Sequence, residues 1–216
     1  MNDVLITVAA IFLLLSFGAD TVFASHDNAK TSDHVSIKIA NELDLIGQHE
    51  NARKLYDHLN HSIEGSNMSV ASAVNYYALG QLNEAKKSFE KIKKGNNRRD
   101  ADYASLWLML LSSIETDHYA VVDDFFEDPI DLATSKMLAG KLSVSIYMDY
   151  IGQYSLENIA QKKDIITQAV FFASTLLVRV KRDHKSAYEI INSNKSRLYG
   201  YSLEKPLIDG LIVGIK

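Results

Sequence analysis

The sequence contains no cysteine and only two prolines in 216 residues. Without cysteine the chain can form no disulfide, no zinc–thiolate site and no iron–sulfur site, and it has no thiol nucleophile. The two prolines, Pro129 and Pro206, leave long stretches free to form helices and argue against a β-sandwich punctuated by proline and glycine. A chain of this size must therefore be stabilised by its hydrophobic core alone, which its length can supply.

The chain also has only a small excess of charge of one sign. It contains 23 Lys and Arg and 27 Asp and Glu, for a formal net charge of −4. Removing Asp3 and Asp20 with the N-terminal segment described below leaves −2. This mild acidity gives no general attraction to nucleic acid, which we exclude as a partner. Apolar residues make up 47% of the chain, as in an ordinary globular protein rather than a disordered one.

Motifs for chemistry are missing as well. The sequence has no Gly-x-Ser-x-Gly, no His-Glu-x-x-His, no phosphate loop and no Gly-x-Gly-x-x-Gly. His58 and His61 stand three residues apart near a predicted helix end, but no third metal ligand accompanies them. We therefore predict no catalytic residue, no metal site and no cofactor, and expect that the protein is not an enzyme.

The one long apolar run lies at the N-terminus, over residues 4–19, and Asp20 ends it. Val22-Phe23-Ala24 then places small residues at the −3 and −1 positions of a cleavage site before Ser25. The run is shorter than the roughly 20 residues of a membrane-spanning helix. These features predict a signal peptide over residues 1–24 and a periplasmic or secreted protein. Because the first three residues carry no Lys or Arg, an uncleaved membrane anchor and an incidental apolar helix stay open.

What the chain does contain is a repeat. The stretch Ile39–Tyr56 returns as Ser72–Phe89, with every landmark moved by 33 residues: Ala40 to Ala73, Gly47 to Gly80, Ala52 to Ala85, Tyr56 to Phe89. A fixed period near this length is typical of helical-hairpin arrays, in which each unit buries its apolar face against its neighbours. Glycine suits the two turns because it adopts a positive φ without strain, and alanine suits a close approach of two helices.

Apolar periodicity predicts four helices in these two units, over residues 35–46, 50–61, 69–79 and 83–93. A third unit is predicted with Tyr103, Leu106, Trp107 and Leu110 on its first helix and Tyr119, Val122, Phe125 and Phe126 on its second. A fourth is predicted from Met137, with Gly152 at its turn. A long, deeply covered helix is expected over residues 164–181, another from His184, and a short final segment after Pro206 that covers the last hairpin.

The first two units resemble tetratricopeptide repeats, which carry small residues, glycine and an aromatic at the same relative positions. The resemblance is good over residues 35–94 and degenerates afterwards. It implies an all-α fold, a right-handed solenoid of about five or six helical hairpins, formed by one domain over residues 25–216.

The same resemblance implies a partner-binding groove, because the first helix of each tetratricopeptide unit lines the concave face. The first unit would contribute His34, Ile37, Asn41, Asp44 and Leu45. The second would contribute Asn67, Val70, Val74, Tyr77 and Ala78, and the third Tyr103, Leu106 and Leu110. Asparagine can pair with main-chain groups and tyrosine offers rigid area with a polar tip, a mixture that suits a bound peptide or helix. The alternative for each aliphatic is a place in the core.

The repeats and the missing chemistry together favour an exported adaptor. It would bind a peptide or helix of another envelope protein, within a secretion, pilus or cell-wall assembly. Two alternatives remain from the sequence: a helical envelope enzyme that acts on glycan, and a periplasmic antidote that blocks a toxin. Membrane contact is expected only if the N-terminal segment is retained.

Overall fold

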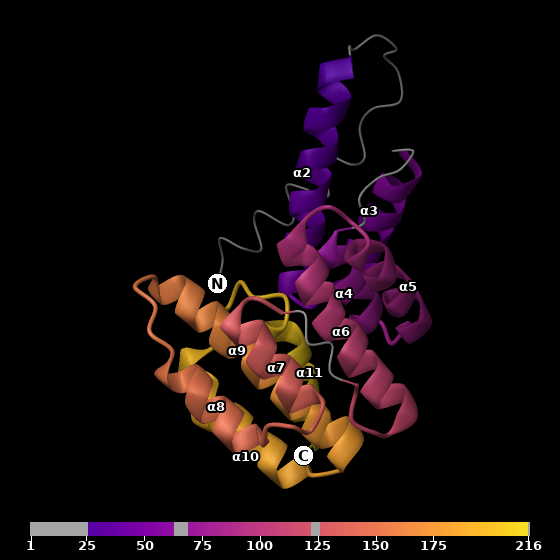
Figure 1. Cartoon of the computed structure of the whole chain (residues 1–216). Helices are drawn as coiled ribbons and strands as arrows, with labels where there is room; N and C mark the ends of the chain where they lie inside the picture. Colours follow the sequence, from indigo (N-terminus) through magenta and orange to yellow (C-terminus); the bar gives the residue numbers. More distant parts are fainter. Residues whose placement is uncertain (1–25, 63–68, 122–125, 216) are drawn as a thin grey trace. The chain divides into compact units, whose positions relative to one another are not determined.

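The computed structural model describes residues 26–62, 69–121 and 126–215, and this part of the chain is helical, without a strand. The all-α class is thus confirmed. The helices are α2 (His26–Leu45), α3 (His49–Ser62), α4 (Val70–Ala78), α5 (Leu82–Lys93), α6 (Arg98–Thr116), α7 (Pro129–Leu138), α8 (Val144–Gln153), α9 (Ile159–Leu176), α10 (His184–Asn194) and α11 (Lys205–Ile215) (Figure 1). A π-helical turn, η1 (Leu177–Lys181), follows α9, and a 3-10 turn, η2 (Lys195–Arg197), follows α10.

The chain divides into two compact units, residues 1–35 and 36–216, and the features below all belong to the second. The predicted signal peptide, residues 1–24, lies outside the described residues. Among the helices that are described, none is both long and apolar enough to cross a membrane.

The repeated glycines and alanines adopt the conformation and the burial that their residue types predict. Gly47 and Gly80 have φ of +77° and +72° and end α2 and α4 with the same pair of backbone hydrogen bonds. In the first turn, Gln48 N–H donates to Leu43 C=O at 2.8 Å and Gly47 N–H donates to Asp44 C=O at 2.9 Å. This is the helix C-terminal motif that a left-handed glycine permits. The four repeated alanines, Ala40, Ala52, Ala73 and Ala85, are fully buried.

The third and fourth units differ from their prediction. Residues 117–121 and 126–128 are not helical, so the expected second helix of the third unit is wrong there, while Val122 and Phe125 lie outside the described residues. The reason is local: Asp117 ends α6 in the left-handed conformation, and the Asp128 side chain accepts hydrogen bonds from the N-terminal N–H groups of α7. Helix α7 begins at Pro129, so Met137 lies near its end rather than at the start of a unit.

The third turn glycine is Gly140, not Gly152. Gly140 has φ of +70° and repeats the turn of Gly47 and Gly80, with Lys141 N–H donating to Lys136 C=O at 2.8 Å. Gly152 lies inside α8. The turn of the predicted fourth unit was therefore placed one helix too late, at Gly152 in α8 instead of Gly140 after α7.

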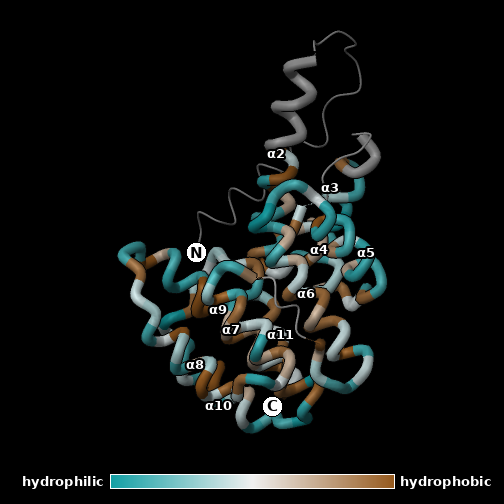
Figure 2. Tube along the Cα trace, viewed as in Figure 1, coloured by the Kyte–Doolittle hydropathy of each residue, from teal (hydrophilic) through white to brown (hydrophobic). Residues whose placement is uncertain are grey.

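Helix α9 is the most deeply covered element, as its apolar pattern predicted. It contacts α6, α7, α8, α10 and α11, and residues 169–177 are all buried. Hydrophobic residues recur along the second half of the chain, whereas α3 and α5 are largely hydrophilic (Figure 2). Phe171 and Phe172 of α9 join Phe89 and Trp107 in an aromatic cluster: Trp107 stacks on Phe89 with ring centroids 5.1 Å apart and lies 5.0 Å from Phe171.

Candidate functional site

The residues predicted to line a groove are mostly covered by the chain itself. Buried side chains are Asp44, Val74, Leu106 and Leu110, and half-buried ones are Ile37, Asn41, Leu45, Val70, Tyr77, Ala78 and Tyr103. The side chain of His34 and all of Asn67 lie outside the described part of the chain. Asn41, Asp44 and Tyr103 already have hydrogen-bond partners within the fold, as the next two clusters show.

A polar cluster around Arg53 joins the first two repeat units. Arg53 is only 5% exposed, and its guanidinium donates to Ser72 C=O at 3.1 Å, to Ser72 Oγ at 3.0 Å and to Asp57 Oδ1 at 3.0 Å. Its Cζ lies 3.9 Å from the centre of the Tyr76 ring, which adds a cation–π contact. Arg53 therefore satisfies polar groups inside the fold rather than offering its charge to a partner.

Asn41 and Asp44, both predicted to lie in the groove, belong to the same polar cluster. Asn41 Oδ1 accepts a hydrogen bond of 2.7 Å from the Tyr56 hydroxyl. Asp44 Oδ1 accepts from Asn75 Nδ2 at 2.6 Å and lies 2.8 Å from His49 Nδ1. Burial, followed by the charge of Asp44, raises the pKa of Tyr56. These contacts indicate a structural role for both residues.

Tyr77 and Tyr103 lie instead at the aromatic cluster. The Tyr77 ring meets Trp107 and Phe171 edge-on, with centroids 5.0 and 5.9 Å apart. Tyr103 meets Phe172 in the same way, and its hydroxyl donates to the carboxyl group of Glu204. The structure thus separates the predicted groove residues into a polar group and an aromatic group.

Glu204 is a buried acid that no motif in the sequence indicated. It is 1% exposed, and its carboxyl group accepts from the Tyr103 hydroxyl and, at 2.5 Å, from Ser202 Oγ. No ion pair holds Glu204 among the described residues. Burial therefore raises its pKa to about 7, and the acid precedes α11 directly.

A pocket of about 690 Å³ opens between the end of α4, η1 and α11. We name it the arginine pocket, because Arg179 and Arg182 line it. Apolar and small residues form most of its wall: Tyr77, Ala78, Gly80, Leu82, Ile114, Phe171, Val178, Pro206, Leu207, Gly210, Leu211, Gly214 and Ile215. His49 and His184 complete the lining, which includes no acidic residue. Two predicted groove residues, Tyr77 and Ala78, lie here.

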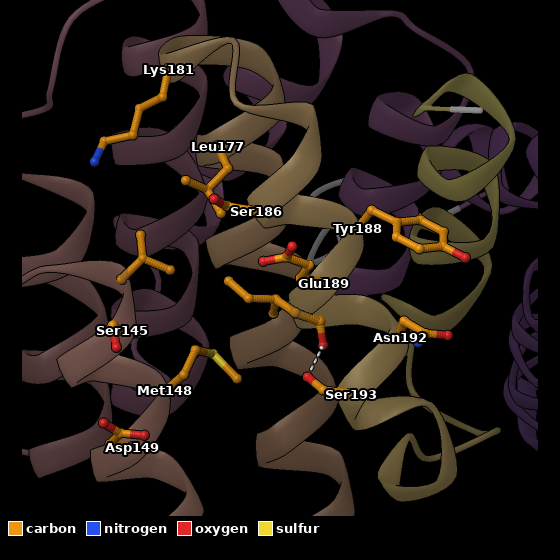
Figure 3. A pocket seen from close by; sticks show the side chains of 12 residues that line it. Ser145, Met148, Asp149, Leu177, Lys181, Ser186, Tyr188, Glu189, Asn192 and Ser193 are labelled. Carbon is orange, nitrogen blue, oxygen red and sulfur yellow. Dashed lines mark hydrogen bonds between the residues drawn. The ribbon is translucent and has the colours of Figure 1, made fainter.

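A second pocket, of about 720 Å³, lies between α8 and α10 (Figure 3). We name it the serine pocket after Ser145, Ser186 and Ser193. Its lining is mixed, with Asp149 and Glu189 beside Lys181 and with Met148 and Leu177 among the apolar residues. One of its polar groups is engaged locally, since Ser193 Oγ donates to the Ile190 carbonyl at 3.1 Å. The mixed charges give no preference for one sign of ligand.

The turn η1 lies between the two pockets, with Arg179 lining the first and Lys181 the second. Its π-helical hydrogen bond runs from Arg182 N–H to Leu177 C=O. Turns of this kind are rare and often mark functional sites. Arg182 and Asp117 are the two described residues other than glycine with a positive φ, at 58° and 55°, and they form an ion pair of 2.8 Å. A positive φ strains the backbone at a residue with a side chain, and of these two residues Arg182 lines the arginine pocket.

The residues of the arginine pocket were mostly missed from the sequence. The available signal was a group of bases, Arg179, Lys181 and Arg182, at the end of an otherwise apolar helix. Among the described residues, no group of three His, Asp or Glu side chains is placed to hold a metal ion.

Comparison with known proteins adds no relative: the sequence matches no protein-family model and no curated protein, and the fold matches no solved structure.

Proposed function

We propose that the chain is an exported adaptor that binds a peptide or helix of another envelope protein in the arginine pocket. The observation that carries the proposal is the lining of this pocket, which combines an apolar wall with charged groups of one sign. It is also the place where the residues predicted from the tetratricopeptide resemblance, Tyr77 and Ala78, reach an open cavity.

The proposal includes the finer fold, a right-handed stack of helical hairpins of the tetratricopeptide type. Its support is the 33-residue spacing of two glycine turns with the same hydrogen bonds, and the full burial of the alanines at equivalent positions. Export rests on the apolar N-terminal run and the small residues before Ser25. Neither a catalytic group nor a cofactor is part of the proposal.

The absence of cysteine allows a direct test by site-specific crosslinking. A single cysteine at Leu82, which is 40% exposed and lines the arginine pocket, would carry a thiol-linked benzophenone. Ile159→Cys is the matched control, because Ile159 is 73% exposed and lines neither pocket. After illumination in an envelope extract of the source organism, we expect one dominant protein adduct from Leu82→Cys and none from Ile159→Cys.

Equal adducts from both positions, or none from Leu82→Cys, would contradict the proposed site. Incubation of the unlabelled protein with purified envelope glycan checks the competing enzyme class. Release of soluble fragments in proportion to protein concentration would reject the adaptor.

A further inference from the structure

The charges around the arginine pocket specify the sign of its ligand. Arg179 is exposed and has no ion pair among the described residues, while Arg182 shares its charge with the exposed Asp117. His49, which also contacts Asp44, and His184 complete the lining. Because no Asp or Glu lines the pocket, an anionic group entering it meets only attraction from its lining.

The glycines of α11 specify the shape of the ligand. Gly210 and Gly214 lie four residues apart, hence on one face of the helix, and both line the pocket. Neither has a positive φ, and a Cβ added at either would meet no atom within 4 Å. Gly210 lies inside α11, where a glycine costs about 1 kcal/mol relative to alanine, whereas Gly214 is the second-last residue of the helix and costs less. Neither the backbone conformation nor packing within the described residues accounts for this cost.

We infer that the arginine pocket binds an acidic helix of the partner, whose backbone crosses α11 at Gly210 and Gly214. This inference rests on the proposed function and names the chemistry of its partner. Two residues without side chains, one turn apart, let a second helix approach more closely than larger residues allow. The carboxylates of the incoming helix then meet Arg179 and Arg182, and its apolar side chains contact Leu207 and Leu211.

A second copy of the chain fits this surface poorly. A two-fold pairing through α11 would bring the same arginines of both copies toward one contact, and like charges oppose such a contact. An added β-strand fits no better, because the described residues offer no sheet edge.

The test uses the full chain and a fluorescent, alanine- and leucine-rich helical peptide of about 15 residues with Glu at every fourth position. The same peptide with Lys in place of Glu is the charge control. Fluorescence anisotropy should show that the Glu peptide binds and the Lys peptide does not. Arg179→Glu should weaken binding roughly tenfold or more, whereas Lys141→Glu, an exposed change outside both pockets, should not.

A steric pair of variants tests the helix crossing. Gly210→Leu with Gly214→Leu should weaken binding of the Glu peptide roughly tenfold or more. Val213→Leu places the same leucine side chain at an α11 residue that is 79% exposed and does not line the pocket, and it should leave binding unchanged. Circular dichroism and the melting temperature of each variant show that the fold is retained. If the double glycine variant loses its fold, Gly210→Ala alone replaces it, with a smaller expected loss.

Equal binding of the Glu and Lys peptides, no binding of either, or full binding by the folded glycine variants would overturn the inference. A dominant protein adduct at Leu82→Cys together with no binding of the Glu peptide would keep the adaptor function and reject the acidic helix. Loss of both results would reject the two proposals together.

Discussion

The junction between α3 and α4 and the junction between α5 and α6 are filled with different chemistry, although the two helix pairs α2–α3 and α4–α5 share their glycine turns and their buried alanines. Between the first two units lies Arg53, 5% exposed and bonded to Ser72. At the equivalent position 33 residues later, Lys86 reaches the surface and pairs with Glu115 at 2.7 Å. There the space is taken by Phe89 and the fully buried Trp107. The repeat thus determines where helices turn and approach, whereas the residues between its landmarks decide what holds each junction together.

The largest effect is expected from emptying the aromatic junction. Trp107 contacts the rings of Tyr77, Phe89, Phe171 and Phe172. Trp107→Ala would leave a large cavity among them, and we expect a loss of about 4 kcal/mol in the free energy of unfolding, measured by urea denaturation.

Trp107→Phe is the matched control. It keeps an aromatic ring in the junction and removes an indole N–H that has no acceptor among the described residues. We expect a much smaller loss than for alanine. Equal losses for the two variants would mean that the ring contacts do not stabilise this junction.

The acid at the edge of the aromatic junction should make stability depend on pH. Folding raises the pKa of Glu204 from 4.5 to about 7, so the folded protein keeps a proton that the unfolded chain releases. The free energy of unfolding should therefore fall as pH rises from about 4.5 to 7, by about 3 kcal/mol, and then level off. Glu204→Gln should remove most of this fall and be more stable than the wild type at pH 8.

Asp131 also contributes to the pH dependence of the free energy of unfolding. Burial and the nearby Asp128 raise the pKa of Asp131 to about 6, so it lowers stability with rising pH in the same direction. It remains in Glu204→Gln, which should therefore keep a smaller slope. A wild-type slope in the variant would show that Glu204 does not hold its proton in the folded state.

Replacing each of the two equivalent basic residues, Arg53 and Lys86, with methionine tests the polar junction. Arg53→Met leaves Ser72 C=O and Asn75 Oδ1 without their buried donor, and we expect a loss of about 2 kcal/mol. Lys86→Met removes only an exposed pair, and its effect should stay within about 0.5 kcal/mol. Chemical denaturation of both variants gives the comparison, and similar losses would contradict it.

The smallest effect concerns the turns that the two units share. Gly80→Ala forces an alanine to a φ of +72°, at a cost of about 1 kcal/mol. Gly152→Ala lies inside α8, where the added Cβ meets only the Arg197 side chain at 4.0 Å, so it should be neutral or stabilising. Melting temperatures of the two variants should therefore shift in opposite directions or by clearly different amounts.

These contrasts show what the sequence could and could not predict. Residues with a local cause were predictable: Gly47 and Gly80 take a positive φ, and the apolar pattern of residues 164–181 indicated the covered helix α9. The turn of the predicted fourth unit was misplaced because Gly152-Gln153 repeats the Gly-Gln pair that begins at Gly47 and at Gly80. Gly140 is followed by lysine, yet it has the positive φ and the matching backbone hydrogen bonds.

The candidate site was less predictable because it joins distant parts of the chain. Tyr77 was identified from its repeat position, but Arg179 and Gly210 reach the same pocket from η1 and α11, about 100 residues and more along the sequence. Asn41 was placed in the groove by the resemblance, and the structure binds it to Tyr56. A repeat pattern records contacts between neighbours and carries no record of such long-range encounters.

The many contacts of helix α9 determine how cooperatively the protein unfolds. In an ideal repeat array each unit touches only its neighbours, so end units can melt or be deleted without the rest. Here α9 contacts α6, α7 and α8 before it in the chain as well as α10 and α11 after it. We therefore expect helices α6 to α11 to unfold in one cooperative step, with Trp107 fluorescence and helicity changing together. Truncation before α9 should unfold α6 and α7 as well, which makes this segment indivisible rather than modular.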